Sequence, residues 1–315
     1  MSPTEDEILE FRAKRYNATV THIEKRHDDL LVMRLKPDFN RAHYLAGQYC
    51  TLGLANFEMR AEGCQPEALS DDDLLKLVRR SYSIGSSVFR DGDSIRNAAD
   101  DDWLEFYIVL VRENLDGRVP ALTPRLFNLR VGDRLQVGEK ITGHFTAEPV
   151  QPGNSVVFLS TGTGEAPHNS MLADLLRTGH TGKILAACCV RYRKDLGYLD
   201  TQERLMALYP QYRYLALTTR EASRTGKVYI QDLISSGELD RHLVELGATG
   251  LDPADTHVFL CGNPKMIGIP AKSKETGLWE YPPPPGVIEI LEARGFRADN
   301  PMLKIEGNIH FEKYW

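Results

Sequence analysis

The sequence predicts two domains, an N-terminal antiparallel β-barrel followed by a C-terminal α/β domain with a parallel sheet. Its 315 residues suit two domains of ordinary size. The first half contains short alternating segments separated by turn residues. The second half alternates continuous apolar runs with helical patterns, which is typical of parallel strands joined by crossover helices. We expect the boundary between residues 150 and 151, which gives domains of 1–150 and 151–315.

Six short strands are expected in the first half, at 18–23, 30–35, 49–54, 81–84, 105–111 and 134–137. Glycine and aspartate punctuate the sequence between them, for example at Gly47, Gly92 and Gly117. One helix is expected at 123–129. Short strands with such turn signals are typical of an antiparallel barrel.

The pattern changes after a Pro- and Gly-containing linker at 148–153. Residues 156–159 form a continuous apolar run, as expected of a buried parallel strand. Further strands are expected at 184–190, 212–217 and 258–260, and helices at 168–176, 201–208, 231–246 (with a break) and 287–293. A last extended segment covers 308–315. Open α/β sheets bind ligands outside the carboxyl ends of their strands, so we expect functional residues there.

The composition argues against several classes of protein. The formal net charge of −6 disfavours nucleic acid as a partner. No run approaches the ~18 apolar residues of a membrane helix, and the acidic first residues show no secretory signal. The 5 cysteines are unclustered, which favours reduced thiols in the cytoplasm. No set of residues has metal-ligand or iron–sulfur spacing, so no metal is expected.

The tetrapeptide Arg80-Ser81-Tyr82-Ser83 lies on an expected strand. The two-residue period of a strand places Arg80 and Tyr82 on one face and the two serines on the other. A guanidinium group suits a pyrophosphate, a phenol ring can lie against a flavin, and a hydroxyl can bond to a flavin nitrogen. A half-exposed strand with an ordinary arginine explains these four residues equally well.

The segment Thr161-Gly162-Thr163-Gly164 joins an apolar strand to a helical pattern. Free backbone N–H groups at a helix N-terminus bind phosphate, and glycines let a ligand approach the main chain. The segment matches neither G-x-G-x-x-G nor a Walker A loop. A tight turn without a ligand is the alternative.

Polar and basic residues follow the next two expected strands. Arg191 follows the second parallel strand, Thr219 and Arg220 follow the third, and Lys227 lies beyond. An arginine after the second strand accommodates the 2′-phosphate of NADP, whereas a carboxylate there suits NAD. These residues therefore favour NADP(H), with a solvated basic loop as the alternative.

Two further segments complete the candidate motifs. Cys261-Gly262-Asn263 ends the last expected parallel strand, and the chain ends in Phe311-Glu312-Lys313-Tyr314-Trp315. A thiol at a strand's carboxyl end faces the ligand crevice, although a lone cysteine is more often packed in a core. A terminal indole can stack on a flat cofactor, although chain ends usually fray.

Taken in this order, these motifs resemble those of the ferredoxin–NADP(+) reductase family, especially its bacterial subclass that ends in Tyr-Trp. Together with Gly47-Gln48-Tyr49, the correspondence covers most of residues 15–315. The resemblance implies an FAD-binding barrel and an NADP(H)-binding α/β domain. It also implies electron transfer between NADPH and a separate ferredoxin or flavodoxin, and we expect a monomer.

The resemblance also implies residue roles. The expected FAD contacts are Arg80, Ser81, Tyr82, Ser83, Tyr107, Ile108, Val109, Ala121, Leu122 and Thr123. Thr163 matches a position shared by both cofactors. The expected nucleotide contacts are the 2′-phosphate clamp of Arg191, Arg220 and Lys227, with Thr219, Gly262 and Asn263. Ser83, Cys261 and Glu312 match residues around the flavin N5 and the nicotinamide, and Trp315 matches the aromatic that covers the other flavin face.

Two segments depart from the compact bacterial pattern, the acidic stretch 57–79 and the insertion 269–285. Both are expected near ligand or partner surfaces. Because ferredoxins and flavodoxins are typically acidic, a basic patch is expected. Its candidates, which also fit a solvated face, are Arg12, Lys14, Arg15, Lys25, Arg26 and Lys313. The alternative functions are the reductase component of an oxygenase system and a cofactor-binding relative without turnover.

Overall fold

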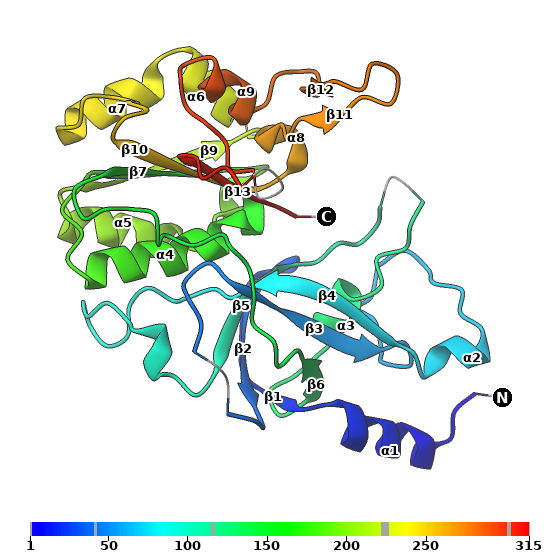
Figure 1. Ribbon diagram of the computed structural model, residues 1–315. Helices are drawn as coiled ribbons and strands as arrows, with labels where there is room; N and C mark the ends of the chain where they lie inside the picture. Colours follow the sequence, from blue (N-terminus) through cyan, green and yellow to red (C-terminus); the bar gives the residue numbers. More distant parts are fainter. Residues whose placement is uncertain (1, 41–42, 115–116, 222–226, 301–303, 315) are drawn as a thin grey trace. The chain divides into compact units, whose positions relative to one another are not determined.

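The structure, a computed structural model, describes all residues except 1, 41–42, 115–116, 222–226, 301–303 and 315 (Figure 1). The chain divides into two compact units, residues 1–87 with 97–144, and residues 88–96 with 145–315. The first unit contains a six-stranded sheet, and the second contains a five-stranded sheet. Antiparallel pairing in the first and parallel pairing in the second confirm the predicted fold class.

The sheet of the first unit has the strand order β4-β3-β6-β1-β2-β5. Its strands are β1 (Ala18–His27), β2 (Leu30–Pro37), β3 (Tyr49–Ala55), β4 (Leu77–Ser83), β5 (Leu104–Val109) and β6 (Arg134–Val137). A bridge between Gly85 and Glu105 brings the two edges of the sheet together. Tyr82 of β4 also packs edge-on against Phe106 of β5, with ring centroids 6.5 Å apart. The sheet therefore curls into a barrel, which removes its exposed edges.

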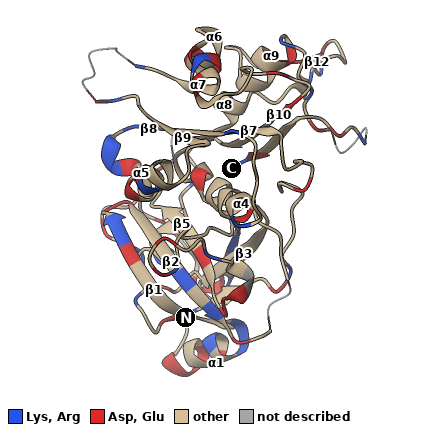
Figure 2. Ribbon diagram, turned by 90° about the vertical axis from the view of Figure 1, so that its left-hand side faces the viewer, with Lys and Arg blue, Asp and Glu red and all other residues tan. Residues whose placement is uncertain are grey.

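The short helices of the first unit are α1 (Glu5–Arg15), α2 (Asp71–Leu74) and α3 (Thr123–Leu126), with a 3-10 turn at Ala98–Asp100. The helix α1 was not among the elements predicted from the sequence. Thr4 and Glu7 form a capping box, in which each side chain accepts the other's backbone N–H. Acidic residues in the first turn and basic residues in the last turn complement the helix dipole (Figure 2).

The sheet of the second unit has the order β13-β10-β7-β8-β9. Its strands are β7 (Ser155–Thr161), β8 (Ile184–Val190), β9 (Tyr212–Thr218), β10 (Thr256–Gly262) and β13 (Ile309–Lys313). The expected extended segment at the end of the chain is thus a fifth parallel strand, paired with β10. This pairing aligns the last described residues with the predicted Cys261-Gly262-Asn263 site.

Helices cover both faces of this sheet. They are α4 (Glu165–Arg177), α5 (Leu199–Leu208), α6 (Ile230–Ser235), α7 (Glu238–Leu246), α8 (Pro264–Ile267) and α9 (Val287–Glu292). Figure 1 shows α4 and α5 on one face, and α6, α7 and α9 on the other. The predicted break in 231–246 lies at Gly237, whose left-handed φ of 74° separates α6 from α7. Inside the expected insertion 269–285, β11 (Ala271–Lys272) and β12 (Trp279–Glu280) pair as a small hairpin.

No helix in the described part of the chain is both long and apolar enough to cross a bilayer. Those same residues contain no cluster of three or more potential metal ligands.

Candidate functional site

Two of the predicted motifs form one interlocked structure at the carboxyl ends of β7 and β10. The backbone N–H of Asn263 donates to Oγ1 of Thr161 at 2.7 Å. A Cβ on Gly164 would lie 2.3 Å from the carbonyl oxygen of Cys261, and one on Gly262 would lie 2.3 Å from Oγ1 of Thr161. Both positions therefore require glycine, because real Cβ atoms do not approach other atoms this closely.

The turn that leads into α4 has one open side. Gly162 has a φ of +53°, and a Cβ there would meet nothing within 4 Å. Residues Gly162–Gly164 form a 3-10 turn that continues into α4, a helix of 13 residues, and the backbone N–H of Glu165 donates back to the carbonyl oxygens of Gly162 and Thr163. This arrangement fits the phosphates of a dinucleotide, which bind to backbone N–H groups at helix N-termini. Thr163 is half-buried in the same turn.

Cys261 and Glu312 lie directly opposite each other on the paired strands β10 and β13. Cys261 is fully buried. Burial, followed by the charge of Glu312, raises the pKa of this thiol well above its usual value. It is therefore a neutral thiol, which suits packing against a ligand better than nucleophilic attack. Trp315, the expected aromatic cover, lies outside the described residues.

Of the predicted 2′-phosphate residues, Arg191 and Arg220 lie side by side just after β8 and β9. The N–H of Thr219 donates to the carbonyl of Val190, and the N–H of Arg220 donates to that of Arg191 at 2.9 Å. The side chains of Arg191, Arg220 and Lys227 are exposed. Nearby Asp195 accepts the backbone N–H of Tyr192 at 3.0 Å and caps that turn.

The tetrapeptide Arg80–Ser83, which is expected to contact the flavin, forms the end of β4. Arg80 is exposed, and its Nη1 donates to the carbonyl oxygen of Arg79 at 2.7 Å. Tyr82 packs on Phe106, and burial raises the pKa of its hydroxyl. Ser81 and Ser83 share the other face, but Ser81 is exposed whereas Ser83 is buried. An exposed arginine beside a half-buried tyrosine and a buried serine fits a flavin dinucleotide, which has a charged and an apolar part.

The other two expected FAD segments lie side by side. Tyr107 and Ile108 are buried on β5, whereas Val109 is partly exposed. The strand ends there, before the expected 111, because Oγ1 of Thr123 accepts the N–H of Val111 at 3.1 Å. Leu122 is buried, and Ala121 and Thr123 are partly exposed. Ser83 belongs to the first unit, and Cys261 and Glu312 belong to the second.

Known proteins resemble this chain in sequence and in fold. Residues 158–272 match the family model described as the oxidoreductase NAD-binding domain. The flavodoxin/ferredoxin–NADP reductase of Buchnera aphidicola subsp. Baizongia pistaciae is 31% identical over 196 residues, which are 61% of this chain and 70% of that protein. The chain belongs to the ferredoxin–NADP(+) reductase family. It is therefore an oxidoreductase.

Other relatives extend the match over most of the reductase. Ferredoxin–NADP reductase A of Sorangium cellulosum is 28% identical over 293 residues, 90% of this chain and 84% of that protein. The crystal structure of a ferredoxin–NADP(+) reductase from Neisseria gonorrhoeae, with bound FAD and NADP, has a TM-score of 0.66 at 21% identity. It covers 95% of this chain and 98% of that one, which shows the common fold.

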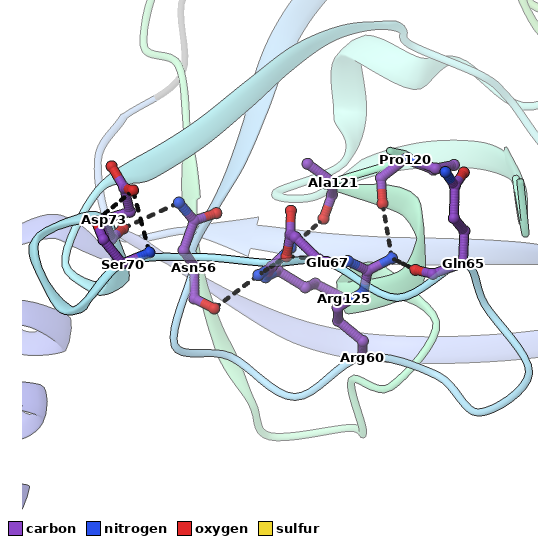
Figure 3. A network of polar contacts seen from close by, with 9 residues as sticks. All are labelled: Asn56, Arg60, Gln65, Glu67, Ser70, Asp73, Pro120, Ala121 and Arg125. Atoms are coloured by element: carbon purple, nitrogen blue, oxygen red, sulfur yellow. Dashed lines mark hydrogen bonds and ion pairs between the residues drawn. The ribbon is translucent and has the colours of Figure 1, made fainter. Parts of the chain in front are cut away.

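An ionic network in the reductase's barrel unit, in which Arg125 is buried and its partners are half-buried, was not predicted from the sequence (Figure 3). Glu67 lies between Arg125, at 2.6 Å, and Arg60, at 3.0 Å. Arg125 also donates to the backbone carbonyl oxygens of Ala121 and Asn56, at 2.5 and 2.7 Å. The network ties the acidic stretch 57–79 to the expected FAD segment Ala121–Thr123. These three residues have no common spacing, so nothing in the sequence singled them out.

The same residues line an open hollow of about 420 Å³. Its wall consists of residues 56, 58, 60–67, 69 and 125. Arg60 and Arg125 already neutralise the charge of Glu67. We therefore interpret the network as structural, since it holds the stretch 57–79 against the barrel.

Proposed function

We propose that the protein is an FAD-dependent reductase that exchanges electrons between NADPH and a one-electron carrier, ferredoxin or flavodoxin. The interlocked glycine turns beside the Cys261–Glu312 pair carry this proposal. Bound FAD supplies the chemistry, because a flavin accepts two electrons as a hydride and releases them singly. The relatives bear the names of ferredoxin and flavodoxin reductases, and the Neisseria gonorrhoeae reductase binds FAD and NADP.

The residues of each unit then have distinct tasks. Arg80 holds the flavin pyrophosphate, and Ser83 donates a hydrogen bond to the flavin at N5. Cys261 packs against the nicotinamide, and Glu312 holds a charge or a proton beside it. Orientation of this kind is the protein's main contribution when a cofactor supplies the reactivity. For Trp315, we propose that its indole stacks on the flavin and is displaced when the nicotinamide binds.

Several residues of the basic patch that was expected to attract the electron carrier are paired with acidic side chains. Of the expected basic patch, Arg12 pairs with Glu58, Lys14 with Glu10 and Arg26 with Glu24. Figure 2 shows basic and acidic residues mixed along α1 and β1. Such pairs reduce the local field that would attract an acidic protein. We keep ferredoxin or flavodoxin as the partner because both names recur among the relatives.

One experiment tests the function directly. The purified protein should be yellow, and anaerobic NADPH should bleach it faster than NADH. Turnover is then measured with a panel of ferredoxins, flavodoxins and oxygenase components. A colourless protein that takes up no FAD on reconstitution would contradict the proposal. Turnover with oxygenase components alone would favour the alternative role.

We expect Arg80→Ala to weaken FAD binding by roughly tenfold or more, because a charge-assisted hydrogen bond contributes ~1.5–3 kcal/mol. The measurement is the FAD dissociation constant of the reconstituted apoprotein. Arg79→Ala is the matched control, since Arg79 is the neighbouring exposed arginine on the opposite face of β4. Equal losses of FAD affinity in both variants would contradict the assignment of Arg80 to the pyrophosphate.

We expect Arg191→Ala and Arg220→Ala each to raise the KM for NADPH by roughly tenfold, for the same energetic reason. NADH lacks the 2′-phosphate, so its kinetics should change little. Steady-state rates with both coenzymes give the answer, and exposed Arg241→Ala on α7 serves as the control. Similar increases in the KM for NADH and for NADPH would contradict the assignment of Arg191 and Arg220 to the 2′-phosphate.

A further inference from the structure

A carboxylic acid is buried next to the turn 161–164, which we propose binds the nucleotide phosphates. Glu165 is the first residue of α4, follows Gly164, and is only 3% exposed. An acidic residue in the first helical turn ordinarily stabilises the helix. At this helix, however, an ionised carboxylate places a buried negative charge close to the turn where the phosphates of the nucleotide would bind. The protonation state of Glu165 therefore bears on nucleotide affinity.

The hydrogen-bond partners of Glu165 are neutral. Nε2 of Gln202 donates to Oε1 of Glu165 at 2.9 Å and to Oδ1 of Asn169 at 2.8 Å. The Tyr212 hydroxyl donates to Oε1 of Gln202 at 2.7 Å, which fixes the orientation of that amide. Gln202 is 1% exposed. Within the described residues, Glu165 forms no ion pair with lysine or arginine, and its Oε2 is buried without a hydrogen-bond partner.

Burial raises the pKa of Glu165 to about 7, although Gln202, Tyr214 and Cys188 favour its charged form. The other titratable groups packed here are Cys188 of β8, Tyr212 and Tyr214 of β9, and His168 of α4. Burial raises the pKa of Cys188, Tyr212 and Tyr214 well above the usual values, and the charge of Glu165 adds to the effect. Burial lowers the pKa of His168 to about 3. All four are therefore uncharged near neutral pH, where Glu165 titrates.

A thiol connects this carboxyl group to the turn. Cys188 lies close enough to Glu165 for the carboxylate charge to affect its pKa. Its Sγ also donates a weak hydrogen bond to the carbonyl oxygen of Gly162, at 3.8 Å. Ionisation of Glu165 thus acts on a group in direct contact with the turn, besides acting through space.

We propose that Glu165 is a positioning residue that links NADP(H) binding to a proton, so that the nucleotide binds best when this carboxyl group is protonated. The inference rests on the proposed function, since it assigns the turn 161–164 to the nucleotide phosphates. Binding should therefore draw a proton onto Glu165, and affinity should fall as the pH rises.

The expected change in the NADP⁺ dissociation constant follows from the fraction of the protein in which Glu165 is protonated. If only the protonated form binds, the apparent dissociation constant equals the intrinsic constant divided by the protonated fraction. For a group that titrates near pH 7, that fraction falls about tenfold between pH 6 and pH 8. We expect the NADP⁺ dissociation constant of the wild type to rise about tenfold over this interval.

The test is calorimetric titration of the FAD-loaded enzyme with NADP⁺ from pH 6 to pH 8, for the wild type and Glu165→Gln. The 2′-phosphate of the ligand titrates near pH 6, but its contribution is common to both proteins. The wild-type dissociation constant should rise about tenfold relative to that of Glu165→Gln. Asp174→Asn, which removes an exposed carboxylate from the far end of α4, should behave as the wild type. Parallel profiles for the wild type and Glu165→Gln would overturn the inference.

A second measurement serves if Glu165→Gln fails to fold. Titration of the wild type at pH 7 in buffers of different ionisation enthalpy should reveal the uptake of about half a proton on binding NADP⁺. Binding without uptake would overturn the inference and leave the proposed function standing. Failure of the wild type to bind NADP⁺ at any pH would instead contradict the proposed function, and the inference with it.

Discussion

Replacing Arg125 by alanine should lower the free energy of unfolding of the barrel unit by about 2–4 kcal/mol, because a hydrogen bond to a charged group contributes ~1.5–3 kcal/mol. Its side chain is 1% exposed, and the substitution removes the donors to Ala121, Asn56 and Glu67 together. The carboxylate of Glu67, only 11% exposed, would keep Arg60 as its partner. Chemical denaturation of the FAD-loaded protein, followed by circular dichroism, measures the change.

Arg130→Ala is the matched control for this prediction. Arg130 follows α3 in the same unit and is exposed, so its replacement should change stability by no more than about 0.5 kcal/mol. A double-mutant cycle with Glu67→Gln isolates the ion pair, because residues in contact give non-additive changes. A loss below about 1 kcal/mol for Arg125→Ala, or strict additivity in the cycle, would show that the network is dispensable.

Replacing Gly164 by alanine should raise the KM for NADPH by roughly tenfold or more. The added Cβ would lie 2.3 Å from the carbonyl oxygen and 2.6 Å from the carbonyl carbon of Cys261. These are backbone atoms, so the two turns must move apart, and overpacking of this kind costs about 1–3 kcal/mol. The φ of Gly164 is −60°, which alanine readily adopts, so the effect is steric rather than conformational. Steady-state kinetics with NADPH measure it.

The FAD content of Gly164→Ala should stay near the wild-type level, because most of the proposed FAD residues, among them Arg80 and Ser83, belong to the other unit. Gly153→Ala provides the control, since its Cβ would meet nothing within 4 Å. An unchanged KM in Gly164→Ala would mean that the interlock of the two turns has no part in nucleotide binding.

Local patterns predicted the regular elements well. The strand at 134–137 and the strand at 184–190 have the expected bounds, and the break in the helical stretch 231–246 falls at Gly237. Strand periodicity and glycine turns are properties of neighbouring residues, which explains this agreement. The missed helix α1 also had a local signal, the capping box of Thr4 and Glu7. The helix α3 stops at Leu126, short of the expected 129.

The order of the two folding patterns and the positions of the glycine turns, the β4 tetrapeptide and the last strand can be predicted from local sequence. Which of these segments touch, and which side chains are buried, depends on how the elements pack. Thr161 meets Asn263 across 102 positions, and Arg125 meets Glu67 across 58. The burial of Glu165 arises from α5, β8 and β9 together. Contacts over such separations depend on how elements pack, and packing has no local periodicity from which it could be predicted.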